Sequence, residues 1–177
     1  MRVTQKLLTT FAALTLLGGT LAYAEGGGGG TKGFSDQVRH ELVMLPYYSV
    51  FDELSYRVDG GKVTLFGNVT QPYLKSNAEN AVKHIEGVTS VDNQIEVLPL
   101  SRFDDGIRLR TYFAIYGFGP LQRYGLPVQA PIRIVVKNGN VTLAGVVDSE
   151  ADRNLAFLRA NGVAGAFSVT NDLKVVR

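Results

Sequence analysis

Two stretches of the chain repeat the same pattern of apolar and polar positions. Residues 54–58 and residues 132–136 place apolar side chains at every second position and end at a Gly-Gly or Asn-Gly turn. Such turns join antiparallel strands, because glycine and asparagine tolerate the positive φ of a tight hairpin. The chain then returns as V-T-L-x-G-x-V in both places, with the period of a second strand. The pattern predicts one β-hairpin in each half.

A helix is predicted before and after each hairpin. Pro72 suits the first turn of one helix, and Ser149 with Asp152 resembles a capping box at the start of another. Gly87 and Gly165 follow these helices, where a left-handed residue ends a helix before the last strand. Apolar residues recur at helical spacing in the first half: Phe34, Val38, Leu42 and Leu45, then Leu74, Ala78, Val82 and Ile85.

The two halves are copies of one domain. A shift of 78 positions aligns residues 54–98 with 132–176 without a gap, and 13 of the 45 pairs are identical, against about three expected from average composition. Each copy is predicted to be an α+β domain of order αββαβ. A right-handed crossover joins its last two strands, so two helices cover one face of a three-stranded mixed sheet. Gly67 and Gly145 in the returning strands predict a close backbone approach, by a packed helix.

The repeat and the composition divide the chain into five parts. Arg2 and Lys6, an apolar run and Ala22-Tyr23-Ala24 are typical of a cleaved secretory signal, which predicts export to the periplasm and no spanning helix in the mature chain. The predicted parts are a signal peptide at 1–24, a glycine-rich linker at 25–33, a first domain at 34–98, a linker at 99–102, and a second domain at 103–177 whose helix-to-strand segment is nine residues longer.

Composition argues against several kinds of chemistry. From Glu25 onward the chain has 16 basic and 16 acidic residues, so bulk attraction to nucleic acid is not expected. The first domain is about −4 and the second about +3. There is no cysteine, and His40 and His84 lie apart in the first copy, so we expect no thiol chemistry, metal or cofactor. The adjacent carboxylates at 52–53 and 104–105 are interpreted as helix caps or solvated charge, and the chain is not predicted to be an enzyme.

The repeated motif resembles a known family. A helix, then G-x-V-T-L-x-G-x-V, an alanine-bearing helix and G-V-x-x-V-x-N-x-I-x-V are similar to the BON domain, in tandem as in hyperosmotically inducible periplasmic proteins. The second copy departs at Gly165-Ala166, where the family has Gly-Val. The resemblance implies a periplasmic, stress-linked and non-enzymatic domain that associates with phospholipid membranes or envelope proteins.

The longer segment of the second copy, residues 108–134, holds the candidate contact residues. Leu109, Tyr112, Phe113 and Tyr116 are predicted to share a helical face, and arginines surround it, which suits a lipid headgroup interface. The alternative is that these aromatics pack the core of the second copy. The candidates for contact with anionic phospholipid or a partner are Arg108, Arg110, Tyr112, Tyr116, Phe118, Arg123 and Tyr124.

Asparagine recurs on the apolar face of the last strand, as Asn93 and Asn171. A buried amide needs hydrogen bonds, so each is predicted to tie this strand to the backbone of a neighbouring loop.

Two functions from different classes remain open. The first is an exported module that associates peripherally with anionic phospholipid and steadies the envelope under stress. The second is a structural module whose sheets pair with each other, with a second copy or with a partner protein, lipid being irrelevant. The sheet faces that would make this contact carry Thr64, Phe66 and Asn68 in one copy and Thr142, Ala144 and Val146 in the other.

Overall fold

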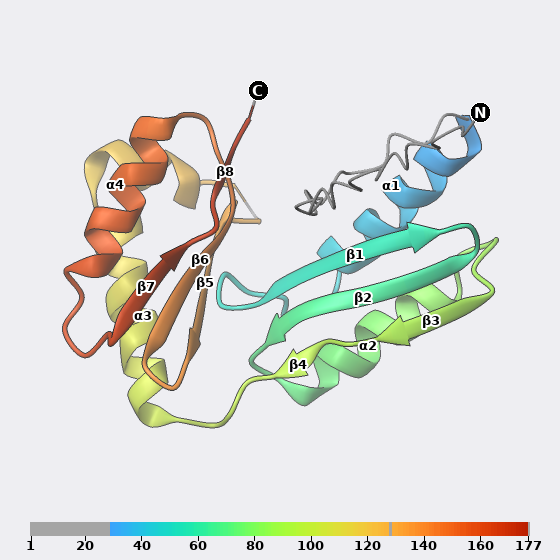
Figure 1. Cartoon of the computed structure of the whole chain (residues 1–177), viewed down its shortest axis with the longest axis horizontal. Coiled ribbons are helices and arrows are strands. Elements are labelled where there is room, and N and C mark those ends of the chain that lie inside the picture. Colours follow the sequence, from blue (N-terminus) through green and yellow to red (C-terminus); the bar gives the residue numbers. More distant parts are fainter. Residues whose placement is uncertain (1–28, 128, 177) are drawn as a thin grey trace, which may run out of the picture.

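The computed structural model describes residues 29–127 and 129–176, which form two lobes (Figure 1). The first lobe contains α1 (Gly29–Val43), β1 (Glu53–Asp59), β2 (Lys62–Val69), α2 (Pro72–Lys83), β3 (Ser90–Asn93) and β4 (Glu96–Val97). The second contains α3 (Arg102–Tyr116), the 3-10 helix η1 (Gly119–Gly125), β5 (Ile132–Lys137), β6 (Asn140–Val147), α4 (Glu150–Asn161), β7 (Ser168–Asn171) and β8 (Lys174–Val175). The predicted signal peptide lies outside the described residues.

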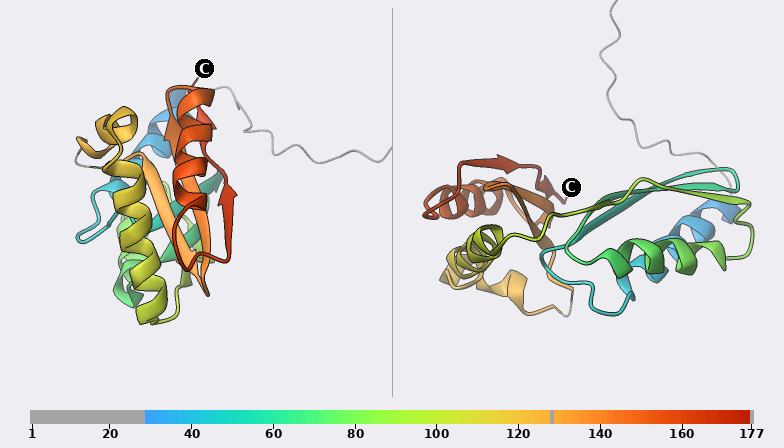
Figure 2. Two further views of the ribbon diagram at one scale, coloured as in Figure 1. Left: turned by 90° about the vertical axis from the view of Figure 1, so that its left-hand side faces the viewer. Right: turned by 90° about the horizontal axis from the view of Figure 1, so that it is seen from below.

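Both lobes have the predicted α+β topology. β1 runs antiparallel to β2, and β2 runs parallel to β3 and β4; β5, β6, β7 and β8 repeat this arrangement. The two helices of each lobe cover one face of its sheet (Figure 2). The apolar residues of the repeat fill the space between, with Val63, Leu65 and Val69 fully buried in the first lobe and Val141 and Leu143 in the second.

The last strand of each copy was predicted as continuous but is divided in two. β3 ends at Asn93 and β4 begins at Glu96, with the pairing to β2 kept in one register on both sides of the break. The break lies opposite Gly67, whose φ of +120° bends β2 away from regular strand geometry. The interruption therefore follows from the glycine in the neighbouring strand.

That glycine is needed for a reason other than the predicted helix contact. A Cβ placed on Gly67 would lie 2.0 Å from the carbonyl oxygen of Glu53 in β1, and one on Gly145 would lie 1.9 Å from that of Pro131. The close approach comes from a backbone carbonyl where the neighbouring antiparallel strand begins, at Glu53 in β1 and at Pro131 just before β5. Both glycines also have positive φ, which side chains other than glycine rarely adopt.

The predicted linker at 25–33 is too long at its C-terminal end, because α1 already begins at Gly29. Val38 and Leu42 of this helix are buried against the first sheet. Residues 25–28 lie outside the described part of the chain.

Replacing Gly67 with alanine should destabilise the protein strongly. The new Cβ collides with the Glu53 carbonyl at a positive φ, so we expect a loss on the order of 2–4 kcal/mol in the free energy of unfolding. Denaturant unfolding measures it. Gly119→Ala is the matched control, since a Cβ there meets nothing within 4 Å. Equal effects of both substitutions would contradict this account of Gly67.

Candidate contact surfaces

Two of the three exposed apolar side chains of α3 lie on one face, and the third, Phe103, lies at the start of the helix. Leu109 and Phe113 are one helical turn apart and keep 52% and 66% of their surface exposed. Two arginines near this pair are also exposed: Arg102, two turns before Leu109, and Arg110, which lies between Leu109 and Phe113 along the helix. We call Arg102, Leu109, Arg110 and Phe113 the α3 face. The predicted helical face is divided in the structure, because Tyr116 points into the core and Tyr112 is half-buried.

Arg108, a predicted contact residue, is part of the core. Only 5% of it is exposed. Its Nη2 donates to the backbone carbonyl of Val136 in β5 at 2.7 Å, and Nη1 pairs with Asp105. A guanidinium buried under its own sheet is not free to meet a phosphate, so the contact prediction for Arg108 is wrong. A helical stripe from sequence alone does not reveal where a neighbouring sheet lies.

Tyr116 and Tyr124 are also core residues, as the alternative interpretation of this segment held. The hydroxyl of Tyr116 donates to the carbonyl of Ile132, and burial raises the pKa of that phenol above its usual range. Tyr124 donates to Asp152 at 3.0 Å and accepts from the amide of Asp148. The bonds of Tyr124 hold η1, which lies in the longer segment of the second copy, against the start of α4.

Arg123, Arg110 and Phe118 are more accessible but are engaged within the lobe. The guanidinium of Arg123 lies over the ring of Tyr124 and pairs with Asp148 and Asp152. Arg110 donates to the carbonyl of Ala164, and Phe118 lies under the guanidinium of Arg159. Of the seven predicted contact residues, Arg110 alone belongs to the α3 face.

Asn93 and Asn171 make equivalent bonds in the two lobes. Their Nδ2 atoms donate to the carbonyls of Lys75 and Arg153, at 2.9 and 3.0 Å. Their Oδ1 atoms accept from the amides of Ile95 and Leu173. Each asparagine therefore ties the divided strand to the adjacent helix, not to a loop as predicted. Gly87 and Gly165, each with φ of +91°, turn the chain between that helix and the strand.

The two lobes meet where residues 43–52 of the first cross β5 of the second. Ile134 donates its amide to the carbonyl of Val50 at 2.9 Å, and Arg133 donates to that of Ser49 at 2.9 Å. The Arg133 guanidinium lies 4.5 Å from the centroid of the Tyr48 ring. Phe51 packs edge-on against Tyr112. We call this contact the junction.

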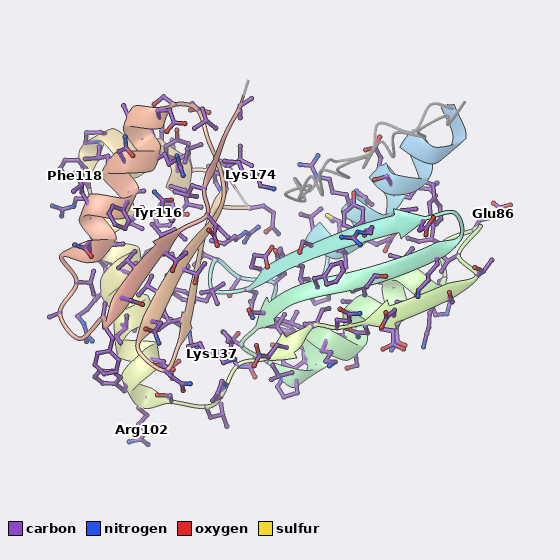
Figure 3. The ribbon with its side chains drawn as sticks, in the orientation of Figure 1. Glu86, Arg102, Tyr116, Phe118, Lys137 and Lys174 are labelled. Atoms are coloured by element: carbon purple, nitrogen blue, oxygen red, sulfur yellow. The ribbon has the colours of Figure 1, made fainter. Side chains whose placement is uncertain are left out.

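The junction differs from the predicted pairing of sheet faces. Thr142 and Ala144 of β6 pair with Val135 and Arg133 of β5, so all four lie on the same face of the second sheet. Val135 and Arg133 are both buried. The first lobe meets β5 with its 43–52 segment, and Lys137 at the end of β5 pairs with Glu96 of β4 (Figure 3). In Figure 1 the second sheet runs across the ends of the first sheet's strands, so the sheets are not stacked face to face.

Two buried carboxylates organise loops, and sequence reasoning had interpreted them as caps or solvated charge. Asp52 is fully buried and accepts four bonds, two from Ser49 and two from Thr70. Asp104 accepts from the amides of Asn138 and Gly139, which fixes the β5–β6 turn on α3. The spacing Ser-x-x-Asp in the sequence indicates the turn at Ser49–Asp52, but only the tertiary fold brings Thr70 to the Asp52 carboxylate.

Glu53 carries a perturbed charge at the junction. Burial raises the pKa of its carboxyl, with Asp172 acting in the same direction, while a hydrogen bond from Ser55 and the charges of Arg133 and Lys174 lower it. The net shift is upward. The charged form of Glu53 is therefore less favourable in the folded protein than in the unfolded chain.

Neither a metal site nor a membrane span is found in the part of the chain that the structure describes. No three His, Cys, Asp or Glu side chains there gather closely enough to hold a metal ion. No helix within residues 29–127 and 129–176 has the length and apolar character needed to cross a membrane.

Comparison with known proteins places these observations in a family. The BON domain matches residues 36–99 and 121–177. Osmotically-inducible protein Y of Escherichia coli (strain K12) is 30% identical over 123 residues, which cover 69% of this chain and 61% of that protein's length. Two structures of CdsD, a structural protein of the type III secretion system of Chlamydia trachomatis, are 11% and 12% identical with TM-scores of 0.28 and 0.27. They cover 81% and 80% of this chain, and 92% and 96% of those chains, but the scores are too low to carry an argument.

Replacing Arg108 with methionine should weaken folding, because Val136 loses its charged donor. We expect a loss of about 1.5–3 kcal/mol in the free energy of unfolding. Arg102→Met, at an exposed position one turn and a half earlier in α3, should change it by no more than about 0.5 kcal/mol. Denaturant unfolding of both variants checks this. An unaltered stability of the Arg108 variant would place that side chain outside the core.

Replacing Glu53 with glutamine should stabilise the protein at pH 7. Folding raises the pKa of the Glu53 carboxyl. Its protonated form therefore contributes to stability below the unfolded pKa of about 4.3, and this contribution is lost as the pH rises through the folded pKa. The gain in melting temperature should therefore shrink towards pH 4. Glu96 is the opposite control: hydrogen bonding to Lys137 lowers its pKa, so Glu96→Gln should lower the melting temperature at pH 7 and lose its effect in acid. If both substitutions changed the melting temperature in the same direction at pH 7, the opposite pKa shifts assigned to Glu53 and Glu96 would be contradicted.

Proposed function

Because the chain belongs to the BON-domain family, we propose that it is an exported, non-catalytic module that associates peripherally with anionic phospholipid at the cell envelope and acts in osmotic stress protection. The support for export is the signal-like sequence at 1–24. The support for a stress role is the similarity to a protein named as osmotically inducible. The chain spans 61% of that relative's length, so the role of the relative is not carried over whole.

The observation that carries the membrane proposal is the α3 face. Two large apolar side chains, Leu109 and Phe113, stay more than half exposed, with Arg102 and Arg110 exposed on the same helix. Apolar side chains enter the boundary between headgroups and acyl chains, while guanidinium groups meet phosphates. The α3 face is smaller than the predicted aromatic and basic segment, because Arg108, Tyr116 and Tyr124 are buried.

The size of the α3 face sets the expected strength of binding. Burying the exposed parts of Leu109 and Phe113 contributes about 1 kcal/mol for each side chain, and each arginine near an anionic surface contributes about 1 kcal/mol. A sum of about 4 kcal/mol gives weak, reversible attachment that depends on anionic lipid and is weakened by salt. This is peripheral association, without insertion of a helix across the bilayer.

A second candidate is an envelope-protein contact through the first lobe. The open face of the first sheet carries Phe66, half-buried beneath the guanidinium of Arg57. Thr64 and Asn68 lie on the same face of β2. This surface is opposite the helices and suits a flat protein partner better than a lipid phase.

Changing Leu109 and Phe113 together to glutamine should release the protein from anionic vesicles. We expect the wild-type chain from Glu25 onward, which keeps every described residue, to sediment with phosphatidylglycerol-containing liposomes at low salt. The variant should bind at least about tenfold more weakly, from the loss of about 2 kcal/mol of apolar burial. The matched control is Leu126→Gln with Leu158→Gln, two exposed apolar residues outside both α3 and the junction.

Three outcomes separate the candidates. Loss of binding in the α3 variant alone supports the α3 face. Equal loss in the control variant would move the contact away from α3. If the wild type sediments with neither anionic nor zwitterionic liposomes, the membrane proposal fails, and the Phe66 face of the first lobe becomes the one to test.

A further inference from the structure

A hollow of about 530 Å³ opens at the end of the first lobe that lies away from the junction. Its lining includes the β1–β2 turn at Gly60 and Gly61, Phe34 of α1, and Glu86 with Gly87 in the turn after α2. Figure 3 labels Glu86 at this end of the molecule. The floor is largely glycine backbone, with one aromatic ring and one carboxylate at its edges.

The equivalent place in the second lobe is occupied by an aromatic side chain of the chain itself. The repeat matches Gly61 with Gly139 and Thr89 with Phe167. A Cβ on Gly61 would lie 2.8 Å from Cγ2 of Thr89, and one on Gly139 would lie 2.6 Å from Cδ2 of Phe167. The same backbone surface therefore carries a methyl group in one copy and a phenyl ring in the other. In the first copy most of that surface is left uncovered.

Phe167 also forms an exposed pair with Phe103. Their rings are 5.8 Å apart, and 74% of Phe167 and 50% of Phe103 are exposed. Arg110 lies beside them, because a Cβ on Gly165 would be 3.2 Å from its Nη2 and 3.5 Å from the ring of Phe103. We call Phe103 and Phe167 the aromatic knob. It lies at the start of α3, the end that Arg102 marks in Figure 3.

We propose that the aromatic knob of one chain docks in the first-lobe hollow of a second copy, so that chains associate head to tail. The second lobe already shows a phenyl ring resting on this glycine surface, which is the fit that the hollow offers. The charges are complementary: Glu86 borders the hollow, Arg110 lies beside the knob, and the lobes carry about −4 and +3. Phe34 provides the hollow with an aromatic wall, as Phe103 does for Phe167.

The geometry makes this association open-ended. The hollow and the knob lie at opposite ends of the molecule (Figure 3), so a chain whose hollow is filled still presents its knob to a third chain. A heterologous contact that does not close adds chains in a row. The knob consists of two side chains, against about 20–30 residues a side in a stable interface, so association requires high protein concentration, as at a crowded envelope.

Sedimentation velocity over a concentration series tests the proposal. For the chain from Glu25 onward, the average mass should rise past that of a dimer as concentration rises, and less steeply in high salt. Phe167→Thr removes the ring of the knob, and Thr89→Phe fills the hollow as the second copy fills its own. Each variant alone should remain monomeric. Their equimolar mixture should form a dimer and stop there, because it contains one intact hollow and one intact knob.

Circular dichroism and the melting temperature establish that each variant is folded before its sedimentation is interpreted. Glu86→Lys, at an exposed position, gives an independent reading if Thr89→Phe does not fold, and it should also reduce association. A wild type that stays monomeric at every concentration would overturn the proposal. So would variants that associate as the wild type does. Thr89→Phe and Glu86→Lys change only the first lobe, away from the α3 face, so vesicle binding and self-association of these variants fail or hold separately. Phe167→Thr lies beside Arg110, so its vesicle binding is measured as well.

Discussion

The burial of Arg133 between the lobes is the contact on which the arrangement of this molecule depends. Its guanidinium is largely removed from water, donates to the carbonyl of Ser49 and stacks on Tyr48. Beside it the amide of Ile134 pairs with the carbonyl of Val50. A buried charge without partners is costly, so the 43–52 segment needs to hold these acceptors in place. Asp52 does this, because its four hydrogen bonds fix the turn that presents them.

The junction also decides which surfaces remain for other molecules. It covers β5, the outer strand of the second sheet, which would otherwise expose a row of unpaired backbone groups. It contacts α3 only on the side of Tyr112, and leaves Leu109 and Phe113 of that helix and the hairpin end of the first lobe uncovered (Figure 1). The junction thus leaves two surfaces uncovered, the α3 face and the hollow with its knob.

Duplication preserved backbone geometry and let the side chains around it diverge. Gly67 and Gly145 keep positive φ because a carbonyl oxygen where the neighbouring strand begins occupies the space of a side chain. Asn93 and Asn171 keep the same bonds to the helix. Where geometry does not demand one residue, the copies differ: Thr89 corresponds to Phe167, and Ser55 to Arg133. The first difference leaves a hollow in one lobe, and the second provides the junction's guanidinium.

The sequence by itself determined the repeat, the order αββαβ and the glycine and asparagine positions, because these depend on local periodicity and backbone conformation. Only the tertiary structure decided the role of the arginines and tyrosines in the long segment of the second copy. Arg108 and Arg110 are two residues apart on one helix, yet the first lies under β5 and the second near solvent. Local spacing gives directions around a helix axis, but burial depends on which distant segment packs there. For α3 those segments are β5, η1, α4 and the 43–52 turn, which the chain brings together only on folding.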